Sequence, residues 1–169
     1  MKVETLLLAE HDWVPNNARL PVILCRHAIT VGEVEATASA FETAFRSNGW
    51  PPQWRDGIFD YHHYHSTAHE AVGIVSGNAR LILGGPKGQD IAVEAGDALI
   101  LPAGTGHCCV EATKDFLVVG AYPDGQDWDI CREAPDASTR KRIADLPVPL
   151  SDPLLGRDGA VNMHWHPGL

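Results

Sequence analysis

Histidine and carboxylate side chains gather in one short stretch of the chain, and their types suit a transition-metal ion. Four of the nine histidines fall within residues 62–69, and one residue separates His63 from His65. Residues two apart on a β-strand point to the same face, so these two imidazoles can reach one ion. His107 follows a Pro-x-Gly turn on what we expect to be a separate strand, and a turn must bring Glu70 back toward the pair. Imidazoles with a carboxylate favour Fe, Mn, Ni or Zn over calcium.

Composition and charge restrict the class of protein. At 169 residues, with 44% hydrophobic and 21% charged residues, the chain suits one globular domain with a sizeable core. Its formal net charge of −9 argues against a basic surface for nucleic acid or anionic lipid. The apolar run at the N-terminus is too short for a signal sequence or a membrane span, and the four cysteines form no CxxC pair. We therefore expect a cytoplasmic protein that binds neither nucleic acid nor a membrane.

The order of elements predicts a mainly β fold with a helix near its start. The aliphatic run 20–28 predicts a strand, and apolar residues at helical spacing predict a helix over residues 33–47 that ends at an Asn-Gly pair. Between residues 58 and 122, short strands alternate with turn signals. We expect these strands near residues 58–65, 70–76, 79–83, 89–94, 97–102, 107–112 and 116–122. Such even spacing favours an antiparallel sandwich or barrel, of which the jelly roll is one form.

The histidine cluster is part of a longer pattern in two halves. These are Gly57-x5-His63-x-His65-x4-Glu70-x6-Gly77 and Gly96-x5-Pro102-x-Gly104-x2-His107. With the stretches 120–125 and 152–156, the pattern resembles the small bacterial cupins of the YjlB type over most of the chain. The resemblance implies an all-β fold, namely a single cupin jelly roll (a double-stranded β-helix), often paired as a homodimer.

We expect one domain in three parts. Residues 1–52 would form an N-terminal extension of strand and helix, residues 53–123 the barrel, and residues 124–169 an irregular C-terminal wrap. Carried over position by position, the cupin pattern implies that one divalent transition metal ion (Fe, Mn, Ni or Zn) is held by His63, His65, Glu70 and His107.

Three neighbours of this site have alternative roles. The second cupin half usually ends in Asn, and Glu111 stands there instead, four residues after His107. By strand alternation Glu111 should share the inward face, either beside a metal ligand or at the rim. Tyr61 shares the face of His63 and either donates a hydrogen bond to a substrate or simply fills the barrel. Cys109 also faces inward, where a cysteine is more often a small buried hydrophobe than a nucleophile.

Two further histidine features leave alternatives. His69 is adjacent to Glu70 and should face away from the ion by alternation, although the nearby turn keeps it as a substitute ligand. The C-terminal His164-Trp165-His166 either packs its tryptophan on the barrel or covers the mouth of the cavity, in its own subunit or in a neighbour.

Two functions are compatible with such a site. Three imidazoles and a carboxylate leave up to two open positions on a six-coordinate ion, where two adjacent oxygens of a small molecule can chelate. The first function is a metal-dependent enzyme acting on a small oxygen-rich metabolite, a dioxygenase or an isomerase, with Glu70, Glu111 and Tyr61 as candidate catalytic residues. The isomerase needs a base, which Glu111 or Glu70 would supply. The second is a module that binds or senses a small ligand without turnover, and the fold does not separate the two.

Overall fold

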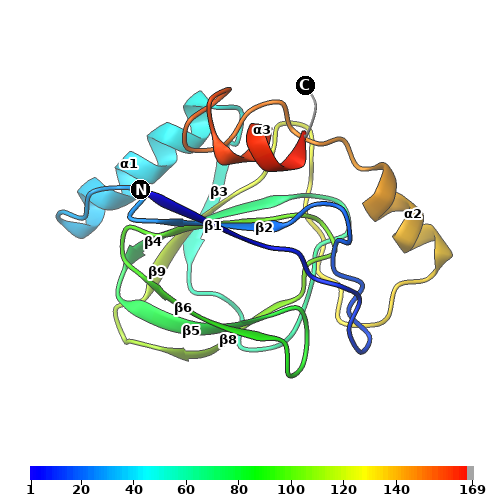
Figure 1. The fold of residues 1–169 in the computed structure, drawn as a ribbon. Coiled ribbons are helices and arrows are strands. Elements are labelled where there is room, and N and C mark those ends of the chain that lie inside the picture. Colours follow the sequence, from blue (N-terminus) through cyan, green and yellow to red (C-terminus); the bar gives the residue numbers. More distant parts are fainter. Residues whose placement is uncertain (167–169) are drawn as a thin grey trace.

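The computed structural model describes residues 1–166, and its strands outnumber its helices (Figure 1). The elements along the chain are β1 (Lys2–Leu6), β2 (Val22–Arg26), α1 (Val34–Ser47), β3 (Pro52–Asp56), β4 (Glu70–Ser76), β5 (Asn78–Leu83), β6 (Gln89–Glu94), β7 (Ala98–Leu101), β8 (His107–Ala112), β9 (Leu117–Ala121), α2 (Ala137–Asp145) and α3 (Ala160–Trp165).

The strands form two antiparallel sheets that face each other. One sheet has six strands in the order β1-β2-β7-β4-β9-β3, and the other has three in the order β6-β5-β8. Neighbours in space are mostly not neighbours in sequence, as in a jelly roll. The predicted mainly β jelly-roll fold is confirmed. The strand predicted at residues 20–28 extends the larger sheet as β2, beside β7.

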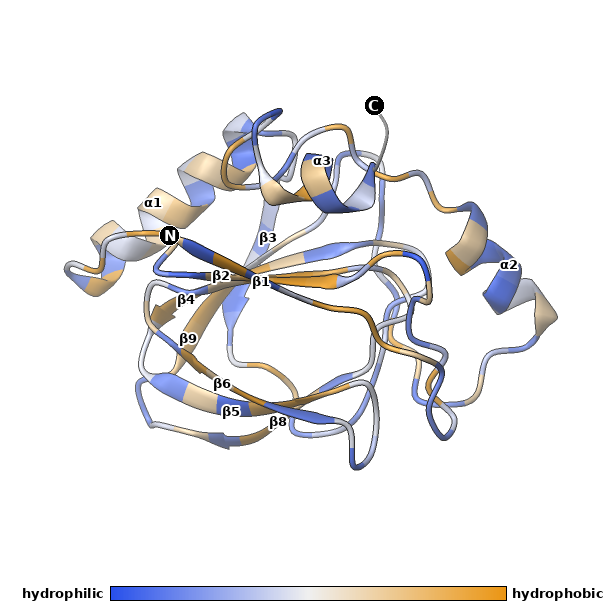
Figure 2. Ribbon diagram, in the orientation of Figure 1, coloured by the Kyte–Doolittle hydropathy of each residue, from blue (hydrophilic) through white to orange (hydrophobic). Residues whose placement is uncertain are grey.

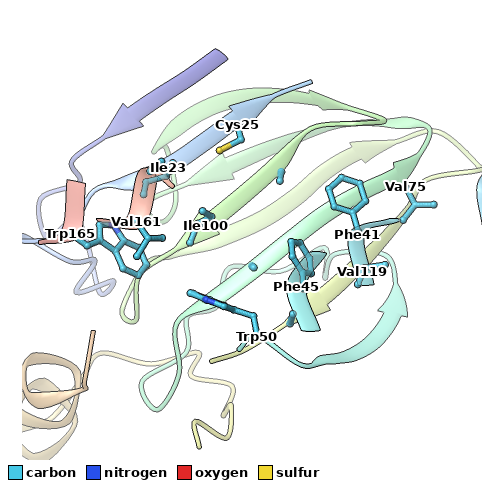
Figure 3. Close-up of a cluster of buried hydrophobic side chains, with 14 of the residues drawn as sticks. Ile23, Cys25, Phe41, Phe45, Trp50, Val75, Ile100, Val119, Val161 and Trp165 are labelled. Atoms are coloured by element: carbon cyan, nitrogen blue, oxygen red, sulfur yellow. The ribbon is translucent and has the colours of Figure 1, made fainter. Parts of the chain in front are cut away.

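Both faces of the six-stranded sheet are buried. Successive residues of a strand point to opposite faces, so Val72 of β4 joins an inner core between the two sheets, whereas Ala71 joins an outer core. Helices α1 and α3 cover the outer face (Figure 1). Figure 3 shows how Phe41 and Phe45 of α1 and Trp165 of α3 pack against it. Figure 2 shows hydrophobic residues concentrated along strands such as β2, β4 and β9.

The segment 58–65 differs from its prediction as a strand. It makes single bridges with two different partners, His63 with His107 and Tyr64 with Cys131. Because its partner changes from one residue to the next, no continuous ladder forms. The structure instead begins an edge strand at Pro52, where a proline is tolerated because its missing N–H costs no ladder bond at the first position.

The C-terminal part is an ordered cover that contains two helices the sequence pattern did not predict. Asp136 caps the start of α2 by accepting a hydrogen bond from the Thr139 N–H. Trp165 is buried in the outer core, and its Nε1 donates to the Pro21 carbonyl at 2.8 Å. The tail therefore packs its tryptophan on the sheet and does not cover the cavity of its own subunit. No helix in the described part of the chain is long and apolar enough to span a membrane.

Candidate metal centre

Four buried side chains from both sheets meet at one end of the space between the sheets. His63 and His65 lie on the segment before β4, Glu70 is the first residue of β4, and His107 is the first residue of β8. A backbone bridge joins His63 to His107, which fixes the ligand segment to the smaller sheet. Ring nitrogens of the three histidines lie within 4.8 Å of one another. The structure thus brings together all four residues that the cupin resemblance implied as metal ligands.

Backbone carbonyls orient all three imidazole rings. The Nδ1 atoms face the carbonyl oxygens of Tyr61 (from His63, 3.0 Å), Thr105 (from His107, 3.0 Å) and Asp129 (from His65). A carbonyl oxygen can only accept a hydrogen bond, so each Nδ1 carries the proton. Each Nε2 is then left with a lone pair directed at the centre, which is the arrangement that metal-binding histidines use.

The carboxylate of Glu70 faces the same lone pairs. Its Oε2 lies 3.2 Å from Nε2 of His65 and 3.3 Å from Nε2 of His107, and when both rings are neutral it has no hydrogen-bond donor among the residues described. Acceptors this close repel unless positive charge lies between them. Two ligand atoms at about 2.1 Å from one ion, at right angles, would be about 3 Å apart, so these separations suit a metal ion. The four residues therefore fit the metal that the sequence predicted.

Burial and charge set the protonation of the centre when no metal is bound. Burial, with the neighbouring His107, lowers the pKa of His63 to about 3. Burial alone would lower the pKa of His65 and raise that of Glu70, but the attraction between these two groups outweighs it. The pKa of His65 is raised and that of Glu70 falls well below its usual range. A proton on His65 thus supplies positive charge that a metal ion would replace.

A hydrogen-bonded pair of aromatic residues holds the other oxygen of Glu70. The Tyr122 hydroxyl donates to Glu70 Oε1 at 3.0 Å and accepts from Trp54 Nε1 at 2.8 Å. Burial and the nearby carboxylate raise the pKa of Tyr122, so the hydroxyl keeps its proton. Gly120 makes room for Trp54, since a Cβ there would lie 2.1 Å from the indole. The sequence analysis missed Tyr122, for which strand alternation along β9 was the one available signal.

The segment 123–131 supports the ligands from outside the barrel. The Asp129 carbonyl accepts from His65, and the Asp129 carboxylate accepts from the Ser66 N–H at 2.6 Å and hydroxyl at 2.5 Å. The Trp128 ring stacks on Tyr122 with centroids 5.7 Å apart and meets the edge of His65. Part of the predicted C-terminal wrap therefore positions the metal centre.

A cavity of about 220 Å³ adjoins the four ligands. Apart from the ligands and Tyr122, its walls are mainly aliphatic and come from both sheets: Val72, Leu81, Leu83, Leu99 and Leu101. Phe59 and Trp128 line it and remain 47% and 41% exposed, so they mark its mouth, together with Asp56. The centre thus opens onto a small, largely apolar chamber.

Two candidate catalytic residues lie outside this chamber. Tyr61 does not line it: its ring stacks on Phe59 at 4.8 Å, and the guanidinium carbon of Arg132 lies 3.9 Å from the ring centroid. Glu111 is exposed and pairs with Arg80 at 3.2 Å. The prediction that Glu111 shares the inward face of His107 is wrong.

A β-bulge explains the outward direction of Glu111. In the β5–β8 pairing Leu81 faces Cys109 while Arg80 faces Glu111, so Val110 is an extra residue and the alternation reverses after it. Cys109 precedes the bulge and faces inward, where it packs in the inner core and burial raises its thiol pKa. It does not line the cavity and takes the role of a small hydrophobe.

His69 points to the opposite side of the sheet from Glu70. Its Nδ1 accepts from the Ala103 N–H at 2.9 Å, and its ring lies 5.0 Å from Trp165 in the outer layer. Strand alternation predicted this opposition, because His69 and Glu70 are consecutive residues. In this arrangement His69 is no ligand.

Comparison with known proteins agrees with this fold. Residues 51–119 match the Cupin domain family. The chain is 32% identical over 158 residues to uncharacterized protein YjlB of Bacillus subtilis (strain 168), covering 92% of each chain. Among solved structures, a chain from work on the DMSP lyases RdDddP and RnDddQII is 23% identical, with a TM-score of 0.35 over 48% of this chain and 40% of that one. A mutant of Bacillus subtilis oxalate decarboxylase OxdC is 20% identical, with a TM-score of 0.30 over 83% of this chain and 33% of that one. These two likenesses are too weak to bear on function. The domain match and the nearly full-length similarity to YjlB identify this chain as a member of the cupin family.

Proposed function

We propose that this protein binds one divalent transition metal ion through His63, His65, Glu70 and His107, and that it is a metal-dependent enzyme acting on a small metabolite. The observation that carries the proposal is the convergence of three Nε2 lone pairs and Glu70 Oε2 with no donor between them among residues 1–166. Fe, Mn, Ni and Zn all suit this ligand set.

The bound ion would supply a Lewis acid for a substrate that chelates through two oxygens. The chain's own residues would position it. Tyr122 keeps Glu70 in a fixed orientation, and the aliphatic walls exclude water from the chamber. Such a site suits a dioxygenase or an isomerase.

The scarcity of free bases favours the dioxygenase. In the described part of the chain, the carboxylates lining the cavity are Glu70 and the exposed Asp56. Glu70 is engaged by the histidines and Tyr122, so an isomerase would lack a free base beside its substrate carbon. Because the described residues offer no free base beside the substrate carbon, a second function also fits the site: a cupin that binds or senses a small ligand without turnover.

One experiment separates these functions. The protein would be purified with its native metal, its co-purifying small molecules identified by mass spectrometry, and each returned to the protein under air and under argon. A product that forms only with consumption of O2 indicates a dioxygenase, and an isomeric product under argon indicates an isomerase. Release of every ligand unchanged under both conditions contradicts the enzyme and supports the binding module.

The wider setting that we propose is a cytoplasmic homodimer with a small-molecule ligand and no nucleic-acid or membrane partner. The cupin resemblance supports the dimer. Light scattering at micromolar concentration would contradict it by returning the mass of one 18.3 kDa chain.

A further inference from the structure

The cavity beside the metal centre has polar groups at one end and hydrocarbon at the other. Its buried polar atoms belong to the four ligands and to the Tyr122 hydroxyl. Leu81 and Leu83 of β5 face Leu99 and Leu101 of β7 across the inner core. These side chains offer no hydrogen bond to a hydroxyl or a second carboxylate. A ligand that enters must therefore keep its polar atoms at the metal end and present an apolar body to the walls.

The charges around the cavity fit a ligand with a single negative charge. A divalent ion with one carboxylate and three neutral imidazoles retains about one positive charge. No arginine or lysine lines the cavity within residues 1–166, and Asp56 adds negative charge at the mouth. A monoanion would neutralise the centre. A second negative charge on the ligand would have no cation to pair with and would be repelled at the entrance.

The size of the cavity limits the length of the apolar body. Its volume of about 220 Å³ lies below the roughly 300–1,000 Å³ of most small-molecule sites. Two adjacent oxygens at the metal and a short hydrocarbon chain fill such a space.

We propose that the ligand of this site is a short 2-oxo or 2-hydroxy monocarboxylic acid with an apolar side chain, and that dicarboxylates, sugars and phosphate esters are excluded. The proposal rests on the metal site of the proposed function. The sequence led us to expect an oxygen-rich metabolite. The proposed ligand is a more specific kind, in which the oxygen atoms are confined to the chelating head and the rest of the molecule is hydrocarbon.

Trp128 and Phe59 would cover the chelating head of the ligand. Both line the cavity and are partly exposed, so ligand binding can bury more of their surface. Trp128 also stacks on Tyr122, which places an indole beside the polar end. The Phe59 ring lies 5.4 Å from the His63 ring, and the Trp128 ring lies 6.1 Å from the His65 ring, so the mouth is beside the metal end. Removing either ring should therefore weaken short and long ligands by similar factors, because both ligands place their chelating head there.

The test is calorimetric titration of the Mn(II)-loaded protein with a series of 2-oxo acids. From pyruvate to 2-oxohexanoate, affinity should rise about fourfold for each added methylene, the fold-change that corresponds to burial of one CH₂ group. The critical pair is 2-oxohexanoate and 2-oxoglutarate, which share the chelating head and have similar lengths but end in a methyl and in a carboxylate. We expect 2-oxohexanoate to bind at least about tenfold more tightly. Equal or tighter binding of 2-oxoglutarate overturns the proposal.

Variants at the mouth provide a second readout. Trp128→Ala should weaken pyruvate and 2-oxohexanoate by similar factors. Ile130→Ala is a matched control on the same segment and should leave both affinities unchanged, because Ile130 is 40% exposed and does not line the cavity. Unchanged affinities in Trp128→Ala, or a loss confined to 2-oxohexanoate, would contradict the placement of Trp128 over the chelating head.

The metal content of the same samples separates this proposal from the proposed function. A protein that takes up no Mn(II) and no other divalent ion fails the proposed function. A protein that takes up Mn(II) but prefers 2-oxoglutarate, or shows no gain with chain length, fails this inference alone.

Discussion

At the scale of single residues, the candidate metal centre depends on hydrogen bonds that orient the ligand side chains. Three backbone carbonyls accept hydrogen bonds from Nδ1 of the histidines, so each Nε2 lone pair is left to face the centre. Tyr122 holds one oxygen of Glu70, and the other oxygen faces the histidines. Such supporting contacts commonly affect metal affinity almost as much as the ligands themselves.

Substitution of Tyr122 by Phe should weaken metal binding about 10–100-fold, because Glu70 Oε1 loses the hydrogen bond from the Tyr122 hydroxyl that orients the carboxylate. It should also destabilise the fold by about 1–3 kcal/mol, since the Trp54 N–H loses its acceptor. Tyr64→Phe is the matched control, because the buried Tyr64 hydroxyl donates to the Glu133 carbonyl away from the centre. Metal titration of both variants checks this, and equal affinities would show that Tyr122 does not support Glu70.

The resemblance to the cupins implied the four candidate ligands, while the groups that support them were not predicted from the sequence. Strand alternation places His63 and His65 on one face, whereas Glu70 and His107 were assigned as ligands by the resemblance to the cupins. Tyr122 and Asp129 are distant in sequence, and only the folded chain brings them to the site. Nothing in the spacing of these two residues distinguishes them from ordinary core or loop positions.

At the scale of elements, the segment 123–131 is part of the candidate metal centre. Asp129 contacts the ligand segment twice, through its carbonyl at His65 and its carboxylate at Ser66. A change that releases this segment should therefore also release the ring of His65.

Asp129→Ala should lower metal affinity about tenfold or more by releasing the segment that orients His65. Asp136→Ala is the matched control, because Asp136 also accepts a backbone N–H bond in the C-terminal part but caps α2. The control should cost about 1 kcal/mol of stability and leave metal affinity unchanged. Competitive metal titration with a chelator measures the difference, and a loss of affinity in both variants would contradict a specific role for Asp129.

Strand alternation predicted most elements of the barrel and failed where the pairing is irregular. The strands from β4 to β9 were predicted to within a residue or two because each of them pairs with a neighbouring strand along most of its length. Segment 58–65 changes partner at each residue, and the bulge in β8 reverses the direction of Glu111. Both irregularities depend on the partner strand, so one strand's sequence does not reveal them.

At the scale of the whole molecule, the six-stranded sheet has the candidate metal centre on its inner face and helices α1 and α3 on its outer face. Glu70 and His69 stand back to back across it, and His69 is buried beneath Trp165. The outer layer thus carries a titratable group that can be examined independently of the metal.

The metal-free protein should lose stability as the pH falls, partly because of His69. Burial lowers the pKa of His69 to about 4, so below the unfolded value of 6.5 the unfolded chain binds a proton that the folded chain does not. The stabilisation is complete above about pH 6.5 and is lost as the pH falls toward 4. Between about pH 7.5 and pH 5 this residue should account for about 2 kcal/mol of the decrease.

Urea unfolding of His69→Asn checks this contribution, because the Asn carboxamide oxygen can still accept the Ala103 N–H. The decrease in stability between the two pH values should shrink by about 2 kcal/mol relative to the parent protein. His164→Asn, at an exposed position of α3, should leave the decrease unchanged. An identical pH dependence in the parent and His69→Asn would contradict a buried, neutral His69.

The most direct test of the account is the metal content of the purified protein and two matched variants. The parent protein should contain about one divalent transition ion per chain, and His107→Ala should contain almost none while keeping its fold by circular dichroism. His69→Asn, altered on the other side of the same sheet, should keep the metal content of the parent. Retention of the ion in His107→Ala, or its loss in His69→Asn alone, would contradict a centre built from His63, His65, Glu70 and His107.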